Sequence, residues 1–430
     1  MHTEVNRIYR SRCRRAVTIH ACLAVVWLAG PLIVTAADGQ ELSRAQVLDA
    51  ARDAKAAETA PPKRSLLERQ LYWYDNQYVL QKLFAGWKGI HLAGGSFPAG
   101  AGLKFGVGFD HRIGRFDPDP ALPNRVDATA RAAYSTNGYA RLSAGVGLRN
   151  LGGAPVDIIV GSQYYEFPQE DFFGIGRGSL KANRTDYLLD SVETSATVRW
   201  RPLTVVDLGA GTSYLNPRIG RGTDRRFSST GERFNPATIP GFQQQPDFLR
   251  SDVSAAFDWR DNPLHPHGGG RYGATVSQFR DQNLDAFDFR RVELDLQQYL
   301  PLPRRYRILA LRANAVLTDA DADQQVPFYF QPTLGGANTL RGFREFRFRD
   351  QNSLLFSAEY RWEAWWALDG ALFVDAGTVA PKRRDLSVGN MDVTYGLGFR
   401  FHSNSAVVGR LDLAFSREGF IPLLRFEHVF

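Results

Sequence analysis

Apolar and polar residues alternate along many long segments of this chain, and this pattern constrains the fold more than any other feature. In residues 192–200 (VETSATVRW) the even positions carry Val, Thr, Ala, Val and Trp, and the odd positions carry Glu, Ser, Thr and Arg. Residues 354–362 (LLFSAEYRW) and 393–401 (VTYGLGFRF) alternate in a similar way. Successive side chains of a strand point to opposite faces, so each segment presents one apolar and one polar face. Repetition of this pattern without intervening helices is typical of strands that face lipid on one side and water on the other.

Sixteen such segments follow one another along the chain. They start near residues 89, 101, 125, 138, 156, 185, 203, 247, 270, 286, 304, 351, 369, 392, 405 and 420. Short turns alternate with long loops, the long ones being 167–184, 216–246 and 319–350. An even number of strands places both ends of a membrane barrel on the periplasmic side, with the long loops outside. We therefore predict an all-β fold for residues 89–430, a 16-stranded antiparallel transmembrane β-barrel.

One observation runs against this interpretation, and one alternative fold shares the alternating pattern. Residues 113–124 (IGRFDPDPALPN) form a long connection on the side where the turns should be short. A soluble β-sandwich also alternates, although its apolar faces share one core. A sandwich rarely contains so many long strands without helices, and it would not need an export signal.

The first 37 residues have the parts of a secretory signal peptide. A basic segment (RIYRSRCRRAV) precedes an apolar one (HACLAVVWLAGPLIV), and the small residues that follow suit cleavage after Ala36 or Ala37. A membrane anchor is the alternative, but Gly30 and Pro31 interrupt a short apolar run. Residues 38–88 show helical spacing broken by two prolines at 61–62, which predicts a short helical periplasmic extension. An exported barrel of this kind is expected in the bacterial outer membrane.

Charge and cysteine content exclude several classes of function. The chain has 52 basic and 45 acidic side chains, and loss of the five arginines and one glutamate of residues 1–37 leaves 47 and 44. This small excess gives no reason to expect a nucleic-acid partner. Both cysteines, Cys13 and Cys22, lie in the signal peptide, so the exported chain is expected to lack disulfides and thiol nucleophiles.

We find no pattern that predicts an enzyme or a cofactor. Serines near histidines show no nucleophile motif. His265 and His267 lie close together, but a metal site needs a third and usually a fourth ligand. None is evident nearby in the sequence, so we expect no metal site. The charges on the inner faces of the strands, such as Asp258, Arg400, Arg410 and Asp412, are interpreted as an ordinary hydrated lumen.

Four motifs, occurring in order, are similar to those of one known family. Residues 335–343 (GGANTLRGF) resemble the inward-folded sixth extracellular loop of the BamA/TamA outer-membrane assembly superfamily, also called the bacterial surface antigen family. Residues 172–176 (FFGIG) resemble its third-loop signature, and 258–269 (DWRDNPLHPHGG) resemble its signature turn. Residues 356–362 (FSAEYRW) and 373–377 (FVDAG) resemble the strands after the sixth loop. The turn residues that carry the resemblance are Asp258, Arg260, Asp261, Asn262 and Pro266.

The resemblance covers the whole predicted barrel and implies an assembly signal at its end. The chain finishes in LLRFEHVF, where Leu424, Phe426 and Phe430 share one face of the last strand. The residues before the first strand leave no room for a periplasmic POTRA domain, and there is no patatin-like lipase domain. The sequence therefore looks like a barrel-only member of the superfamily.

The arginine of the sixth-loop motif is the central candidate site residue. The motif consists of Leu340, Arg341, Gly342 and Phe343. Alternation places Glu359 and Asp375 on the inner, charged faces of two successive strands, where the family pattern pairs them with the arginine. A bidentate arginine–carboxylate pair would hold the loop in the lumen against its conformational entropy. Gly342 is expected to allow a tight bend, and Phe343 to pack against the inner wall. The alternative is a solvated basic loop without a fixed partner.

The resemblance implies a function without a cofactor: assisting the insertion or translocation of proteins, or of lipids, at the outer membrane. The implied partners are the lipid bilayer and lipopolysaccharide, unfolded outer-membrane or secreted client proteins, and a periplasmic protein. In the family, the first and last strands meet at a weak seam. The short, glycine-rich first strand and Pro422, which lacks an N–H donor, would weaken it here. The alternative function is a channel or binding barrel with its sixth loop as a plug.

Overall fold

The computed structural model describes residues 89–92, 97–98, 100–115, 124–303, 307–365, 367–402 and 407–425. The expected signal peptide (1–37), the expected helical extension (38–88), Phe426 and Phe430 lie outside these residues. None of the helices within the described ranges is both long and apolar enough to span a membrane.

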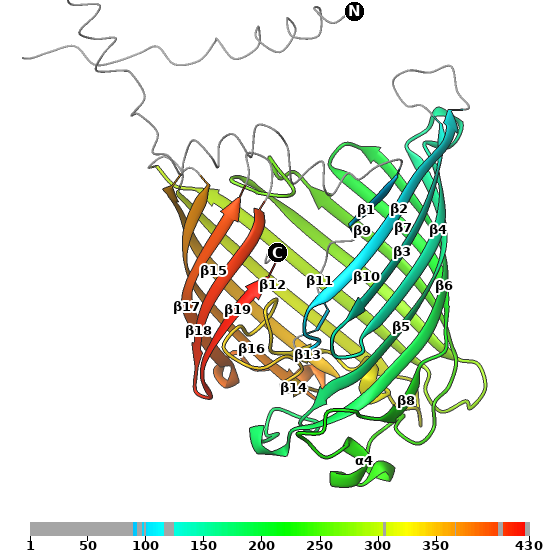
Figure 1. Cartoon of the computed structure of the whole chain (residues 1–430), viewed down its shortest axis with the longest axis vertical. Helices are drawn as coiled ribbons and strands as arrows, with labels where there is room; N and C mark the ends of the chain where they lie inside the picture. Colours follow the sequence, from blue (N-terminus) through cyan, green and yellow to red (C-terminus); the bar gives the residue numbers. More distant parts are fainter. Residues whose placement is uncertain are drawn as a thin grey trace, which may run out of the picture. The chain divides into compact units, whose positions relative to one another are not determined.

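The described residues form one large antiparallel sheet that makes the wall of a barrel (Figure 1). Its strands are β1 (Ile90–Leu92), β2 (Lys104–Arg115), β3 (Arg125–Ser135), β4 (Ala140–Arg149), β5 (Val156–Phe172), β6 (Thr185–Leu203), β7 (Val206–Leu215), β8 (Arg218–Arg221), β9 (Phe248–Asp258), β10 (Gly269–Asp281), β11 (Phe289–Pro301), β12 (Arg307–Ala320), β15 (Asn352–Trp365), β16 (Leu368–Ala380), β17 (Asp392–His402), β18 (Val407–Ser416) and β19 (Gly419–Arg425). The predicted all-β barrel fold is confirmed.

The sheet has seventeen strands, but β8 takes up the pairing with β6 where β7 leaves it. The two strands therefore share one position in the wall, and the described strands occupy the sixteen positions predicted from the alternation.

Short helices lie in the connections and contribute little to the wall. They are η1 (Leu151–Gly153), η2 (Lys181–Asn183), α4 (Thr230–Arg233), η3 (Pro236–Thr238), η4 (Phe328–Phe330), η5 (Arg383–Asp385) and η6 (Val388–Asn390).

Alternation along the strands sorts side chains to the two faces of the wall. In β16, Leu372 and Val374 are exposed on the outside, whereas Phe373 and Asp375 are buried inside. Many other large apolar residues are exposed on the outer face, including Leu103, Phe105, Val253, Tyr395 and Leu424. An apolar surface of this extent is not stable in water, and it matches the lipid-facing band of a membrane barrel.

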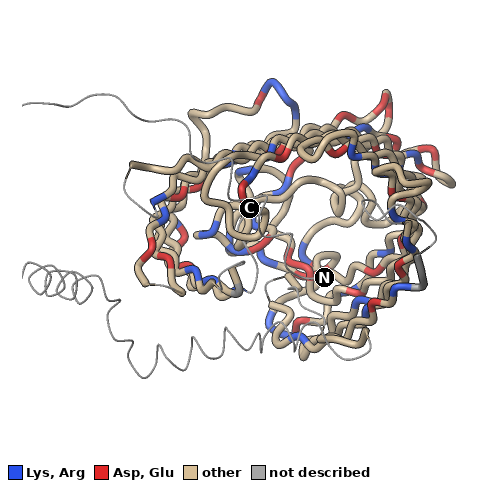
Figure 2. The backbone as a smooth tube through the Cα atoms, turned by 90° about the horizontal axis from the view of Figure 1, so that it is seen from above, with Lys and Arg blue, Asp and Glu red and all other residues tan. Residues whose placement is uncertain are grey.

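Long loops gather at one end of the barrel, and one of them folds inward. The long connections β5–β6, β8–β9 and β12–β15 all lie at the lower end in Figure 1. We call residues 321–351, between β12 and β15, the lumen loop. It contains a two-stranded sheet of β13 (Thr333–Leu334) and β14 (Phe348–Arg349). In the view from above, segments of chain carrying both charge signs lie inside the ring of strands (Figure 2).

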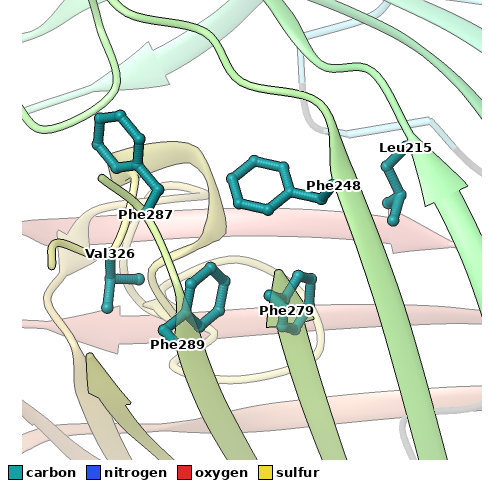
Figure 3. Packing of buried hydrophobic residues seen from close by; sticks show 6 residues of the cluster. All are labelled: Leu215, Phe248, Phe279, Phe287, Phe289 and Val326. Atoms are coloured by element: carbon teal, nitrogen blue, oxygen red, sulfur yellow. The ribbon is translucent and has the colours of Figure 1, made fainter. Parts of the chain in front are cut away.

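An aromatic cluster fixes the first part of the lumen loop to the wall. Figure 3 shows side chains from β7, β9, β10, the β10–β11 connection and β11 in one cluster with Val326 of the loop. The rings of Phe279 and Phe289 stack with centroids 4.3 Å apart, and Phe330 of the loop packs against the same cluster. Buried aromatic side chains contribute strongly to packing, so this cluster holds the loop stem where it enters the barrel.

Candidate functional site

Arg341 is completely buried at the tip of the lumen loop, and its guanidinium faces the inner wall of β15 and β16. Nε and Nη2 donate to the two oxygens of Asp375, at 2.9 and 2.7 Å. Nη1 donates to Glu359 Oε2 at 2.7 Å. The ring centroid of Phe373 lies 3.5 Å from the guanidinium carbon. The structure thus brings together the three residues predicted from the motif and the strand alternation, with a fork geometry that lysine lacks.

Further charged residues surround this clamp. Glu359 also accepts hydrogen bonds from Arg361 and Arg400. Asp412 of β18 accepts from Arg400 at 2.6 Å and from Arg410 at 3.1 Å. Each of these side chains is at most 2% exposed. We call Arg341, Glu359, Arg361, Asp375, Arg400, Arg410 and Asp412 the clamp network.

The clamp network corrects the expectation of a hydrated lumen at this level. Arg400, Arg410 and Asp412 are buried because the lumen loop covers them. Arg410 donates to the side chain of Asn338 in the loop, and Arg312 of β12 donates to the Asn338 carbonyl at 3.1 Å. The loop tip is therefore held from both β12 and β18.

Burial makes this network energetically demanding. Four arginines face three carboxylates away from water, where Coulomb interactions are strong and desolvation is costly. Asp375 has the Arg341 fork and the Thr394 hydroxyl as partners. Removal of one partner from a buried ion pair typically costs about 3–5 kcal/mol. The network therefore strongly favours one docked position of the loop.

The three neighbours of Arg341 in the motif fit the loop tip to the wall. Leu340 and Phe343 are buried in a cluster with Leu334, Phe348, Leu355 and Val379. Gly342 is required for a reason other than the expected bend, since it is not in a left-handed conformation. A Cβ at this position would lie 2.6 Å from the carbonyl oxygen of Phe415 in β18, and Ser416 Oγ donates to the Gly342 carbonyl at 2.6 Å. Glycine is needed because the loop backbone touches the β18 backbone.

Two further arginines attach the outer part of the lumen loop. Arg347 donates to the hydroxyl and carbonyl of Ser179, and forms an ion pair with Glu418 at 2.8 Å. The FFGIG segment lies against the same part of the loop, where the Gly176 amide donates to the Arg349 carbonyl at 2.7 Å. Phe173 lies 5.1 Å from the Arg347 guanidinium. The third-loop signature and the sixth loop therefore contact each other directly.

The predicted signature turn connects β9 and β10 and is built on its own side chains. Arg260 forms two hydrogen bonds with Asp258, at 2.9 and 2.7 Å. Asp261 Oδ1 accepts from the backbone amides of Asn262 and His267. Pro266 is buried in the turn. These residues shape the turn, and none of them belongs to the clamp network.

The turn also holds a group that the sequence analysis missed. The sequence shows no third metal-type ligand close to His265 and His267, but the structure places Asp369 and His402, which are distant in the chain, beside His265. Of the predicted assembly-signal residues, Leu424 lies on β19 with its side chain exposed on the outside, and Phe426 and Phe430 lie outside the described residues.

Comparisons with known proteins identify the family of this barrel. Residues 172–419, more than half of the chain, match the Omp85 superfamily domain. The chain belongs to the Omp85 superfamily. This family of outer-membrane barrels includes the proteins that the motifs resemble, so the predicted family membership is confirmed.

Two solved structures match this Omp85 barrel, the first of them at the level of the fold. One is BamA from Haemophilus ducreyi lacking POTRA domains 1–3, with a TM-score of 0.56, 14% identity, and 78% of this chain and 68% of that chain covered. The other is CdiB from Acinetobacter baumannii, with a TM-score of 0.44, 11% identity, and 75% and 56% covered. No curated protein matches the sequence.

Proposed function

We propose that this Omp85 barrel assists the insertion or translocation of proteins, or of lipids, at the outer membrane. Its partners would be the bilayer with lipopolysaccharide, unfolded outer-membrane or secreted client proteins, and a periplasmic protein that delivers them. The observation that carries the proposal is the Arg341 clamp, which fixes the lumen loop against β15 and β16 through buried ion pairs. Such a loop keeps the lumen closed while the barrel wall acts on a client.

An arginine of the last strand contacts both the lumen loop and the start of the barrel. Arg425 of β19 forms an ion pair with Glu345 of the loop at 3.1 Å. The same guanidinium donates to the carbonyl of Phe97, which lies between β1 and β2, at 3.4 Å. One arginine thus connects the last strand, the start of the barrel and the loop.

The end strands have features that favour opening of the wall. β1 has three residues, Ile90–Leu92, and Pro422 in the middle of β19 lacks a donor for a further strand. We infer that a client strand enters at this seam while the clamped loop keeps the rest of the barrel in place. Cysteines replacing Pro98 and Arg425, joined by a flexible thiol crosslinker, should abolish activity, and unchanged activity of the crosslinked barrel would contradict the seam.

A channel or binding barrel is the second candidate. It is favoured by a polar cavity of ≈ 430 Å³ at the turn end of the barrel, lined by charged residues that include Arg199, Asp207, Asp258 and Arg271. In that case the lumen loop acts as a plug, and the barrel conducts ions without affecting client folding.

The deciding experiment reconstitutes the barrel in liposomes and follows the folding rate of an unfolded outer-membrane client. We compare the native barrel with Arg341→Ala and with Arg344→Ala, whose exposed side chain lies in the same loop. Acceleration by the native and Arg344→Ala barrels, lost in Arg341→Ala, supports an assembly function that depends on the clamp. Ion leakage without acceleration in any of the three refutes the assembly function and supports the channel.

A further inference from the structure

Three side chains from distant parts of the chain meet at the short-turn end of the barrel. They are His265 in the β9–β10 turn, Asp369 at the start of β16 and His402 at the end of β17. His265 Nε2 lies 2.9 Å from Asp369 Oδ2, and His402 Nε2 lies 3.3 Å from Asp369 Oδ1. The three ligand atoms all lie within 4.8 Å of one another. The side chains of His265, Asp369 and His402 are 6%, 9% and 12% exposed, so the cluster is largely withdrawn from water.

This contact requires the β9–β10 turn to cross the end of the lumen. In the strand ladder, β11, β12 and β15 lie between β10 and β16. Asp369 is on the same inner face of β16 as Asp375, so the turn meets the wall from the lumen side. A backbone hydrogen bond from the Val407 amide to the Leu264 carbonyl, at 3.3 Å, adds a second attachment on β18. The turn therefore lies as a strap across the barrel end.

The chemistry of the cluster differs from that of the clamp network. Arg400 is directly opposite Asp369 in the β16–β17 register, yet its guanidinium turns away to Glu359 and Asp412. Asp369 is instead held by two imidazoles. A carboxylate and two imidazoles are a typical donor set for Zn²⁺ and similar ions.

The distances fit such an ion. Tetrahedral zinc with ligands at about 2.0–2.1 Å places neighbouring donor atoms roughly 3.3 Å apart. The two observed separations, which end on different oxygens of Asp369, are close to this value: 2.9 Å from His265 Nε2 to Oδ2 and 3.3 Å from His402 Nε2 to Oδ1. We propose that His265, Asp369 and His402 form a binding site for a divalent transition-metal ion of the zinc type, and that the bound ion locks the β9–β10 turn across the lumen.

The test uses the full chain, folded in detergent, purified through a tag without histidine and stripped with a chelator. Zn²⁺ is titrated in competition with a chromogenic chelator, and Co²⁺ is added separately as a spectroscopic probe. We expect one tight Zn²⁺ per chain and visible absorption bands typical of four-coordinate Co²⁺. His265→Gln, Asp369→Asn and His402→Gln should each weaken Zn²⁺ binding about tenfold or more, since each removes one ligand. His111→Ala is the matched control, because His111 is exposed on β2 and lies outside the cluster.

Zn²⁺ should also protect the β9–β10 turn from proteolysis in the native barrel, and the chelator should reverse this protection. The difference in gel mobility between heated and unheated samples reports whether each variant has folded. If the variants do not fold, the native protein still decides, through the Co²⁺ spectrum and the protection of the turn. Absence of both, or equal Zn²⁺ affinity in the native and Asp369→Asn barrels, overturns the proposal.

Discussion

Replacement of Arg341 by alanine should release the lumen loop without unfolding the barrel. The change removes the fork to Asp375 and the hydrogen bond to Glu359. Glu359 keeps Arg361 and Arg400, but Asp375 is left with the Thr394 hydroxyl and a long bond from the backbone amide of residue 341, which are much weaker partners for a buried carboxylate. We expect a cost of about 3–5 kcal/mol for the docked loop. At roughly 1.4 kcal/mol per factor of ten, docking becomes two to three and a half powers of ten less favourable.

Hydrogen exchange measured by mass spectrometry on the detergent-folded barrel reads this shift directly. In the docked loop, the Gly336 amide donates to the Phe343 carbonyl and the Phe343 amide donates to the Leu340 carbonyl, each at 3.0 Å. These amides should exchange faster in Arg341→Ala by a factor of the same order as the loss of docking, while the strand amides stay protected. Arg344→Ala should exchange like the native barrel, because the Arg344 side chain is exposed.

A double variant separates the clamp from a general effect of the substitution. Arg341→Ala combined with Asp375→Ala leaves no unpaired carboxylate in the wall, so the combined loss should be smaller than the sum of the two single losses. Loop protection that stays at the native level in Arg341→Ala would refute the reasoning, because it would mean that packing alone holds the loop.

Three further outcomes follow from the same contacts. Gly342→Ala should weaken loop docking by about 1–3 kcal/mol, because an added Cβ would lie 2.6 Å from the Phe415 carbonyl oxygen. Gly178→Ala is the control, since a Cβ there meets open space and should not affect docking. Equal hydrogen-exchange protection of the loop amides in both variants would contradict this prediction. Arg347→Ala removes the bonds to Ser179 and Glu418, so proteolysis should begin in the outer part of the loop, and a native cleavage pattern would count against it. Arg425→Ala breaks the links to Glu345 and Phe97 and should speed exchange in β19 relative to β18, measured by the same exchange experiment; matched rates in the two strands would exclude this role.

The sequence predicts the centre of the clamp well because strand alternation decides which residues face inward. Glu359 and Asp375 are both on the inner face, on neighbouring strands, and a loop arginine can reach both. The resemblance of residues 335–343 to the sixth extracellular loop of the family indicates that this arginine is Arg341. Neither step depends on knowing how full the lumen is.

Prediction of the rest of the clamp network would require knowing how much of the lumen is filled by protein. Arg400 and Arg410 are opposite each other in the register of β17 and β18, and alternation alone assigns both to the lumen. Alternation does not say whether water or protein occupies the lumen, so these arginines resemble hydrated pore charges in the sequence. Their burial follows from the loop contacts, in particular from Asn338, which lies just outside the motif of Leu340, Arg341, Gly342 and Phe343.

The His265, Asp369 and His402 cluster fails to appear in the sequence for a different reason. Asp369 lies 104 positions after His265 in the chain, far beyond the spacing of any local metal motif. Their meeting results from a turn that crosses three strands of the barrel end. The one sequence signal that we can identify for this cluster is strand alternation, which places Asp369 on the same inner face of β16 as Asp375.

The clamp network is better suited to positioning a loop than to stabilising a barrel. A buried group of four arginines and three carboxylates adds little net stability over apolar residues of the same volume, because desolvation offsets the attraction. Apolar side chains, however, would let the loop slide along the wall at small cost, whereas the Arg341 guanidinium of the loop fits both oxygens of Asp375 and one oxygen of Glu359. Intermediate positions would leave Arg341 and Asp375 buried without their partner, so the loop has one docked state and, once the bonds of Arg341 break together, a released state. This all-or-none behaviour would let a barrel with a weak seam move its end strands while the lumen stays closed, and it explains why the loop is held by ions rather than by more phenylalanines.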